Sequence, residues 1–121
     1  MAKAIQTYRD LKAWDEAMYL VEDIYKITKK LPSEEQYGLR SQIRRCAVSL
    51  PSNIAEGHGR KGNKEFMHHL SIAKGSLSEL ETQLILCVRL EYISRTDLKP
   101  IWDRTQIVSK LISGLVKSLM R

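Results

Sequence analysis

One long stretch without proline and with a regular apolar spacing constrains the fold of this chain more than any other feature. Between residues 63 and 92 the apolar side chains recur in alternating steps of four and three, at Phe66, Leu70, Ala73, Leu77, Leu80, Leu84 and Cys87. This spacing places all of them on one face of a helix and is typical of a coiled-coil-like seam. The chain is therefore expected to pack helices side by side around an apolar core.

Three further segments show helical spacing, so we predict four helices. The first runs from Asp10 to Lys30, and the fourth begins around Asp97. The second follows Pro32 and is expected to use Ser33 and Gln36 as a capping box, whereas Asn63 is the expected N-cap of the third. The first helix carries two adjacent apolar stripes, Ala13, Ala17, Leu20, Ile24, Ile27 and Leu31 beside Trp14, Met18, Val21 and Tyr25, which together predict a wide buried face.

Pro51 lies inside the second predicted helix. Its nitrogen cannot donate to the carbonyl of Ala47, and its ring crowds the preceding turn. Short connections make successive helices antiparallel. The sequence therefore predicts a single all-α domain over residues 1–121, an antiparallel up-down-up-down four-helix bundle whose second helix is kinked or broken near Pro51.

The apolar content and the cysteines indicate where in the cell this domain is expected. The longest apolar run, Leu84 to Val88, is far too short to cross a bilayer, and the N-terminal residues lack a signal-peptide pattern. Cys46 and Cys87 lie within apolar helical patterns and are interpreted as buried reduced thiols. We expect a cytoplasmic protein without a membrane segment.

The residues that could carry catalysis do not assemble into a reaction site. Glu65 and His68 have the Glu-x-x-His spacing of di-iron bundles, but such sites need a second motif and further inward carboxylates. Glu56 and His58 lie near glycines without an accompanying nucleophile. The glycines Gly57, Gly59 and Gly62 match a dinucleotide spacing but follow a helix rather than a strand. We predict no enzyme, no metal site and no cofactor.

Basic residues are the remaining candidates for function, since the net charge is +6. The candidate nucleic-acid-binding residues are Arg40, Arg44, Arg45, Arg60, Lys61, Lys64, Arg104, Lys110 and Lys117. Two interpretations stay open for the arginines of the second helix. They bind phosphates, or they pair with acidic side chains on a neighbouring helix or subunit. No stacking aromatic residue is recognised beside them, so binding is expected to be weakly sequence-specific.

The C-terminal part of the third helix is apolar almost all round, and a helix of this kind needs covering on every side. A small bundle cannot easily cover it alone, which indicates self-association. The candidate interface residues are Leu84, Ile85, Val88, Tyr92, Ile107 and Leu111.

Several stretches of the chain carry a family resemblance. They are residues 8–14 (YRDLKAW), 37–45 (YGLRSQIRR), 49–57 (SLPSNIAEG), 73–80 (AKGSLSEL) and 111–115 (LISGL). With them the chain resembles the ribosomal-RNA intervening-sequence protein family, in which Phe is frequent where this chain has Tyr8. The resemblance implies a four-helix bundle that assembles into a ring-like homopentamer. It also implies similarity to the accessory variability proteins of diversity-generating retroelements, which bind nucleic acid and a reverse transcriptase. It supplies no catalytic residues.

Two functional hypotheses follow. The first is a non-enzymatic homo-oligomer, pentameric by the resemblance, that binds RNA or DNA non-specifically through a basic surface. The second is a structural scaffold that engages another protein and has no nucleic-acid role.

Overall fold

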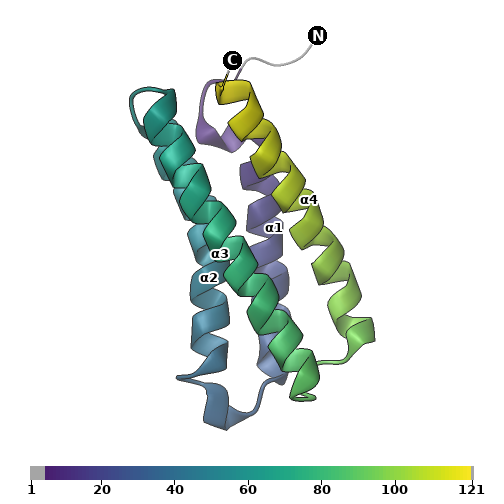
Figure 1. The fold of residues 1–121 in the computed structure, drawn as a ribbon. Coiled ribbons are helices and arrows are strands. Elements are labelled where there is room, and N and C mark those ends of the chain that lie inside the picture. The colour runs from purple at the N-terminus through teal and green to yellow at the C-terminus, as the bar shows by residue number, and fades with distance from the viewer. Residues whose placement is uncertain (1–4, 121) are drawn as a thin grey trace.

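The computed structural model describes residues 5–120, which form four long helices joined by short connections (Figure 1). The helices are α1 (Lys12–Ile27), α2 (Leu39–Gly59), α3 (Asn63–Arg89) and α4 (Arg95–Leu119). Three short 3-10 turns, η1 (Tyr8–Asp10), η2 (Thr28–Lys30) and η3 (Ser33–Glu35), flank α1 and precede α2. No strand occurs within residues 5–120.

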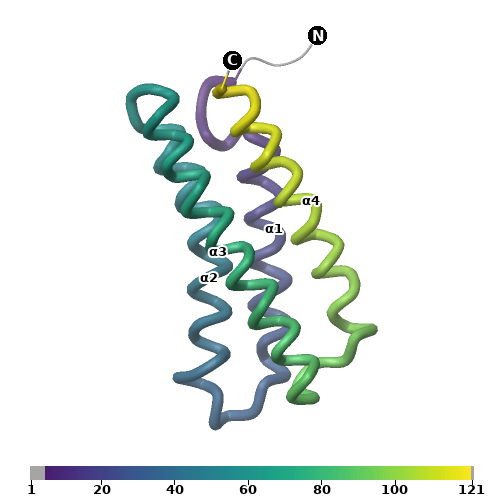
Figure 2. The backbone as a smooth tube through the Cα atoms, viewed as in Figure 1, coloured from purple at the N-terminus to yellow at the C-terminus, as the bar shows by residue number. Residues whose placement is uncertain are grey.

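The four helices run alternately up and down, as the backbone trace shows (Figure 2). Contacts link α1 with α2, α2 with α3, α3 with α4, and α4 with α1, which is the cycle of a four-helix bundle. The prediction of an all-α antiparallel bundle is confirmed. None of the helices in residues 5–120 has the length and apolar character that a bilayer-spanning segment requires.

The core is built from the apolar stripes that the sequence indicated. All seven positions of the α3 seam are buried, and Leu20, Ile24, Ile43, Leu50 and Ile54 are fully buried opposite them. The second stripe of α1 is different, because Met18 and Tyr25 are exposed and Trp14 and Val21 are only partly buried. The prediction that both stripes of α1 are buried is therefore wrong for the second one.

The helix α2 continues through Pro51 without interruption, so the predicted break is wrong. Pro51 and its neighbour Leu50 are buried in the bundle, and this packing keeps the helix together on both sides of the missing hydrogen bond. Asn53 adds support one turn later, since its Nδ2 donates to the carbonyl of Ser49 at 2.9 Å. A bend of α2 near Pro51 stays a prediction.

The starts of three helices differ from the sequence prediction. Ser33 and Gln36 form no capping box; α2 begins at Leu39, whose N–H donates to Glu35 Oε1 at 3.0 Å. Because Glu35 lies in the turn before α2, this carboxylate caps the helix from outside it.

At α3 the residue before the helix is Gly62, with a φ of 89° that favours glycine. Asn63, the predicted N-cap, is instead the first helical residue, and its Nδ2 donates to the carbonyl of Leu119 at 3.2 Å. At α4 the helix begins at Arg95, two residues before the predicted start, and Ser94 caps it by accepting a bond from the N–H of Asp97 at 3.0 Å.

Candidate functional site

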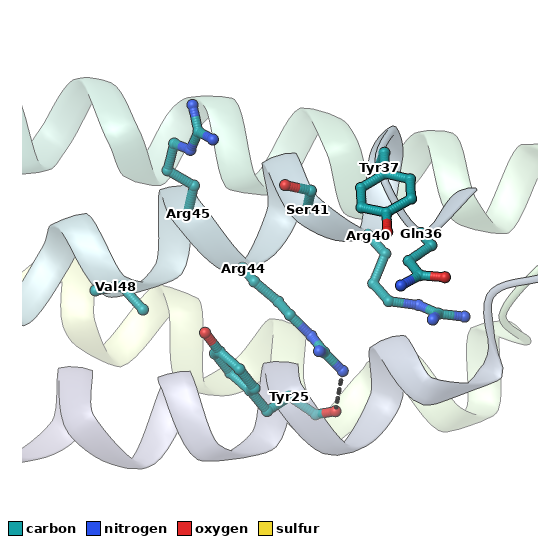
Figure 3. Close-up of a pocket in the computed structure, with 8 residues that line it drawn as sticks. All are labelled: Tyr25, Gln36, Tyr37, Arg40, Ser41, Arg44, Arg45 and Val48. Carbon is teal, nitrogen blue, oxygen red and sulfur yellow. Dashed lines mark hydrogen bonds between the residues drawn. The ribbon is translucent and has the colours of Figure 1, made fainter. Parts of the chain in front are cut away.

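A surface pocket of about 590 Å³ lies where the end of α1 faces the start of α2 (Figure 3). We call it the arginine pocket. Its lining residues are Tyr25, Gln36, Tyr37, Arg40, Ser41, Arg44, Arg45 and Val48. The first cluster of basic residues singled out in the sequence therefore surrounds one cavity.

Arg44 binds the C-terminal end of α1, and Arg40 binds the 3-10 turn η2 that follows it. Arg40 Nε donates to the carbonyl of Thr28 at 3.1 Å, and its Nη2 donates to the carbonyl of Leu31. Arg44 Nη2 donates to the carbonyl of Tyr25 at 3.1 Å. The last carbonyls of a helix lack partners within the helix and carry partial negative charge. The two arginines supply these partners from the neighbouring helix.

Thr28 connects this arrangement to the core. Its buried hydroxyl donates to the carbonyl of Ile24 at 2.6 Å and accepts a bond from Arg44 Nε at 2.9 Å. The guanidinium of Arg44 also lies 4.5 Å from the ring centroid of Tyr25, within the range of a cation–π contact. Sequence reasoning missed Thr28, although a threonine at a helix end facing an apolar stripe is a signal of such a bond.

The arginines of the pocket form no ion pair within the described residues, although Arg45 also lines a neighbouring surface pocket together with Glu79. Within residues 5–120 no carboxylate lies within ion-pair distance of Arg40, Arg44 or Arg45. In the described part of the chain, these arginines therefore do not pair with acidic side chains of a neighbouring helix. Arg45 is exposed, and Figure 3 shows it extending from α2 away from Arg44 and Tyr25.

Aromatic side chains do lie beside these arginines, contrary to the sequence prediction. Tyr25 comes from α1, nineteen residues before Arg44, and Tyr37 comes from the turn before α2. Tyr37 is 90% exposed. The spacing of α1 predicts Tyr25 in a buried stripe, and no local pattern marks Tyr37 as a side chain on which bases could stack. The helix packing brings both into the pocket.

The remaining basic candidates lie elsewhere. Arg60, Lys61 and Lys64 are exposed around the α2–α3 connection, which is about 24 Å along α2 from Arg44 at the rise of an α-helix. Arg60 Nη2 lies 3.4 Å from Glu56 Oε1. Lys110 and Lys117 are exposed on α4. The nine residues therefore do not form one continuous patch on a single chain.

Arg104 is held by acidic partners and so contributes little free positive charge. Its Nη1 lies 3.1 Å from Glu16 and its Nε lies 3.1 Å from Asp23, both on α1. Its guanidinium also lies 5.3 Å from the ring centroid of Tyr19. These contacts join α4 to α1, which indicates a structural role in place of the predicted nucleic-acid contact.

The candidate interface residues divide between core and surface. Leu84 is fully buried among the bundle's own side chains, so its assignment to an oligomer interface is wrong. Ile85 and Ile107 are roughly half exposed, and Val88, Tyr92 and Leu111 are partly buried.

A second pocket, of about 530 Å³, lies between α3 and α4. It is lined by Ile85, Val88, Arg89, Arg95, Leu98, Lys99 and Trp102. Trp102 was missed by the sequence reasoning. Leu86 and Leu90 add further exposed apolar surface on the last turn of α3 and just beyond it.

The other titratable groups do not converge. No group of three or more His, Cys, Asp or Glu side chains in residues 5–120 is placed to hold a metal ion. His69, rather than His68, faces Asn53 and Glu56, at 3.2 and 3.8 Å from its Nδ1. Cys46 and Cys87 are buried and free, as predicted. Burial raises the pKa of each thiol to about 11, so both stay protonated at neutral pH.

The chain is similar to a known structure and matches a known protein family. A crystal structure of a protein of unknown function from the S23 ribosomal protein family of Bacteroides thetaiotaomicron superposes with a TM-score of 0.80 at 26% sequence identity, covering 87% of this chain and 98% of that one. No curated protein matches the sequence. The family model described as 23S rRNA-intervening sequence protein matches residues 9–114. Since this match spans most of the bundle, the chain belongs to the 23S rRNA-intervening sequence protein family.

Proposed function

We propose that this protein is a non-enzymatic, homo-oligomeric bundle that binds RNA or DNA by contacting phosphates, at a basic surface assembled from several copies. The observation that carries the proposal is the arginine pocket. Its three arginines have no carboxylate partner within residues 5–120, and two of them are held in place by backbone carbonyls. Guanidinium groups fixed in this way suit phosphate oxygens, because little side-chain entropy is lost on binding.

The overall charge supports the same proposal. Each chain contributes a net charge of +6, so assembly concentrates positive charge and attracts polyanions. A homopentamer is the assembly that the family resemblance implies. The setting we propose is the cytoplasm, whose reducing conditions suit the two free cysteines.

The test is the binding of a labelled RNA and a labelled DNA, followed by fluorescence anisotropy over a range of salt concentrations. We expect affinity to fall linearly on a log–log plot, with a slope of about −0.7 to −0.9 for each phosphate contacted. Arg45→Gln is expected to weaken binding and to make the slope shallower. The matched control is Lys30→Gln, which removes a positive charge already paired with Asp97 and lies outside both the arginine pocket and the pocket between α3 and α4. A wild-type protein that binds neither nucleic acid at low salt refutes the proposal.

Self-association is proposed to use the pocket between α3 and α4, which another copy of the chain would cover. Ile85, Val88 and Trp102 line it, Leu86 and Leu90 add exposed apolar surface at the end of α3, and apolar groups of this kind are stabilised by removal from water. Sedimentation of the 14.0 kDa chain at micromolar concentration tests this. A species of monomer mass alone rules it out.

A second function is favoured by the same apolar surface. If another protein covers it in place of a second copy, the bundle is a scaffold for that protein and needs no nucleic acid. The scaffold proposal expects a complex that survives nuclease treatment and that is lost in an Ile85→Glu variant. The same variant should leave RNA binding by a single chain unchanged, because Ile85 lies outside the arginine pocket.

A further inference from the structure

Tyr37 is the most exposed of the large apolar side chains in the described part of the chain. Its relative exposure is 90%, against 71% for Met120 and 39–52% for the other exposed ones. A single exposed apolar residue is ordinary on a protein surface. The surroundings of Tyr37 are not ordinary, because its ring lies at the edge of the arginine pocket, beside Gln36 and Arg40 (Figure 3).

The two tyrosines of the pocket differ in how much of their ring faces is available to a ligand. One face of Tyr25 is taken by Arg44, whose guanidinium lies 4.5 Å from the ring centroid. Within residues 5–120 Tyr37 has neither an aromatic nor a cationic partner. Its ring therefore offers a flat surface on which another planar group can stack.

Hydrogen-bonding groups follow Tyr37 along the outer side of α2. Ser41 is four residues further on, and Arg44 and Arg45 come next, so all of them line the same pocket. Arg44 uses Nε and Nη2 for Thr28 and Tyr25, and in residues 5–120 its Nη1 binds no acceptor. The pocket thus combines a free aromatic ring with uncompensated guanidinium groups.

A planar ring with an attached phosphate is the ligand that matches this combination. Bases in a duplex are stacked on one another, whereas unpaired bases can be splayed out onto aromatic side chains. A cavity of about 590 Å³ is within the size range of small-ligand sites. We propose that the arginine pocket holds one unpaired nucleotide of a single-stranded segment, with its base stacked on Tyr37 and its phosphate facing Arg44.

This inference rests on the proposed nucleic-acid function and adds a preference to it, for single strands over duplexes. The test uses fluorescence anisotropy with three labelled probes, an unstructured RNA oligonucleotide, the DNA of the same sequence and the corresponding RNA duplex. Comparing the RNA with the DNA shows whether the protein prefers one of the two sugars. Stacking on an aromatic ring does not distinguish RNA from DNA.

Three variants accompany the wild type. Tyr37→Ala is expected to weaken single-strand binding by about five-fold or more and to leave duplex binding unchanged. Tyr37→Phe keeps the ring and should bind as the wild type does. Tyr19→Ala removes an exposed tyrosine of α1 outside the pocket, beside Arg104, and should also bind normally. Because Tyr37 is almost fully exposed, its replacement leaves the fold intact.

The outcomes separate the two proposals. If the wild type binds no nucleic acid, both fail. If it binds single strands but Tyr37→Ala binds them equally well, or if it prefers the duplex, the nucleotide pocket is refuted while nucleic-acid binding stands.

Discussion

The approach of α2 to α3 at Gly57 gives a sharp test of the bundle packing. A Cβ added at Gly57 would lie 2.7 Å from His69 Cβ and 3.0 Å from Phe66 Cδ1. Carbon atoms attract best at roughly 3.5–4.0 Å. His69 Cβ is fixed to the backbone of α3, so the contact is relieved only if the helices separate. We therefore expect Gly57→Ala to be destabilising.

The magnitude follows from two opposing effects. Overpacking of a well-packed core costs about 1–3 kcal/mol. Replacing glycine by alanine in a helix contributes up to about 1 kcal/mol in the other direction, and less at Gly57, which lies in the last turn of α2. The expected net loss in the free energy of unfolding is about 1–2 kcal/mol.

The matched control is Gly75→Ala, in the middle of α3. No heavy atom lies within 4 Å of a Cβ added there, so only the helix preference acts. We expect a gain of about 0.5–1 kcal/mol. Both variants are compared with the wild type by urea unfolding, monitored by far-UV circular dichroism at equal protein concentration, because assembly would shift apparent stability. Equal stability of the two variants would refute the close approach of α2 and α3.

Two further predictions concern buried polar groups. Gln83 is 8% exposed, and its Oε1 has no hydrogen-bond partner in residues 5–120. Gln83→Leu should therefore raise the free energy of unfolding by about 1 kcal/mol. A lower free energy of unfolding for this variant, measured in urea, would contradict the prediction. The thiols of Cys46 and Cys87 have pKa values of about 11 in the fold, against 9.0 when free. The unfolded chain therefore releases these protons first, and stability should fall as pH rises from 9 to 11. The double variant with alanine at both positions should lose less stability over this range, and an identical loss would exclude the thiols as a cause.

The candidate site was only partly predictable from the sequence. The sequence indicated the arginines of the pocket because they are close together in one segment. Arg40 and Arg44 are four residues apart, and Arg45 follows directly. The sequence did not indicate their partners, because the carbonyls of Tyr25 and Thr28 belong to another helix. Arg104 shows the same limit, since its partners Glu16 and Asp23 lie far away along the chain.

The sequence by itself determined the buried seam of α3, although it did not determine how wide the buried face of α1 is. The four-and-three spacing from Phe66 to Cys87 is a property of one helix, and every position of that seam is buried in the bundle. Local pattern suffices there because the helix geometry alone decides which side chains share a face.

Only the tertiary structure decided what happens on the surface and at the helix ends. The rotation and offset of α1 against α2 place Tyr25 under Arg44 and leave Tyr37 open to solvent. Packing on both sides likewise lets α2 pass through Pro51, where the isolated helix would be weakened. These outcomes depend on neighbours that are distant in sequence, and a periodic pattern within one helix carries no information about them.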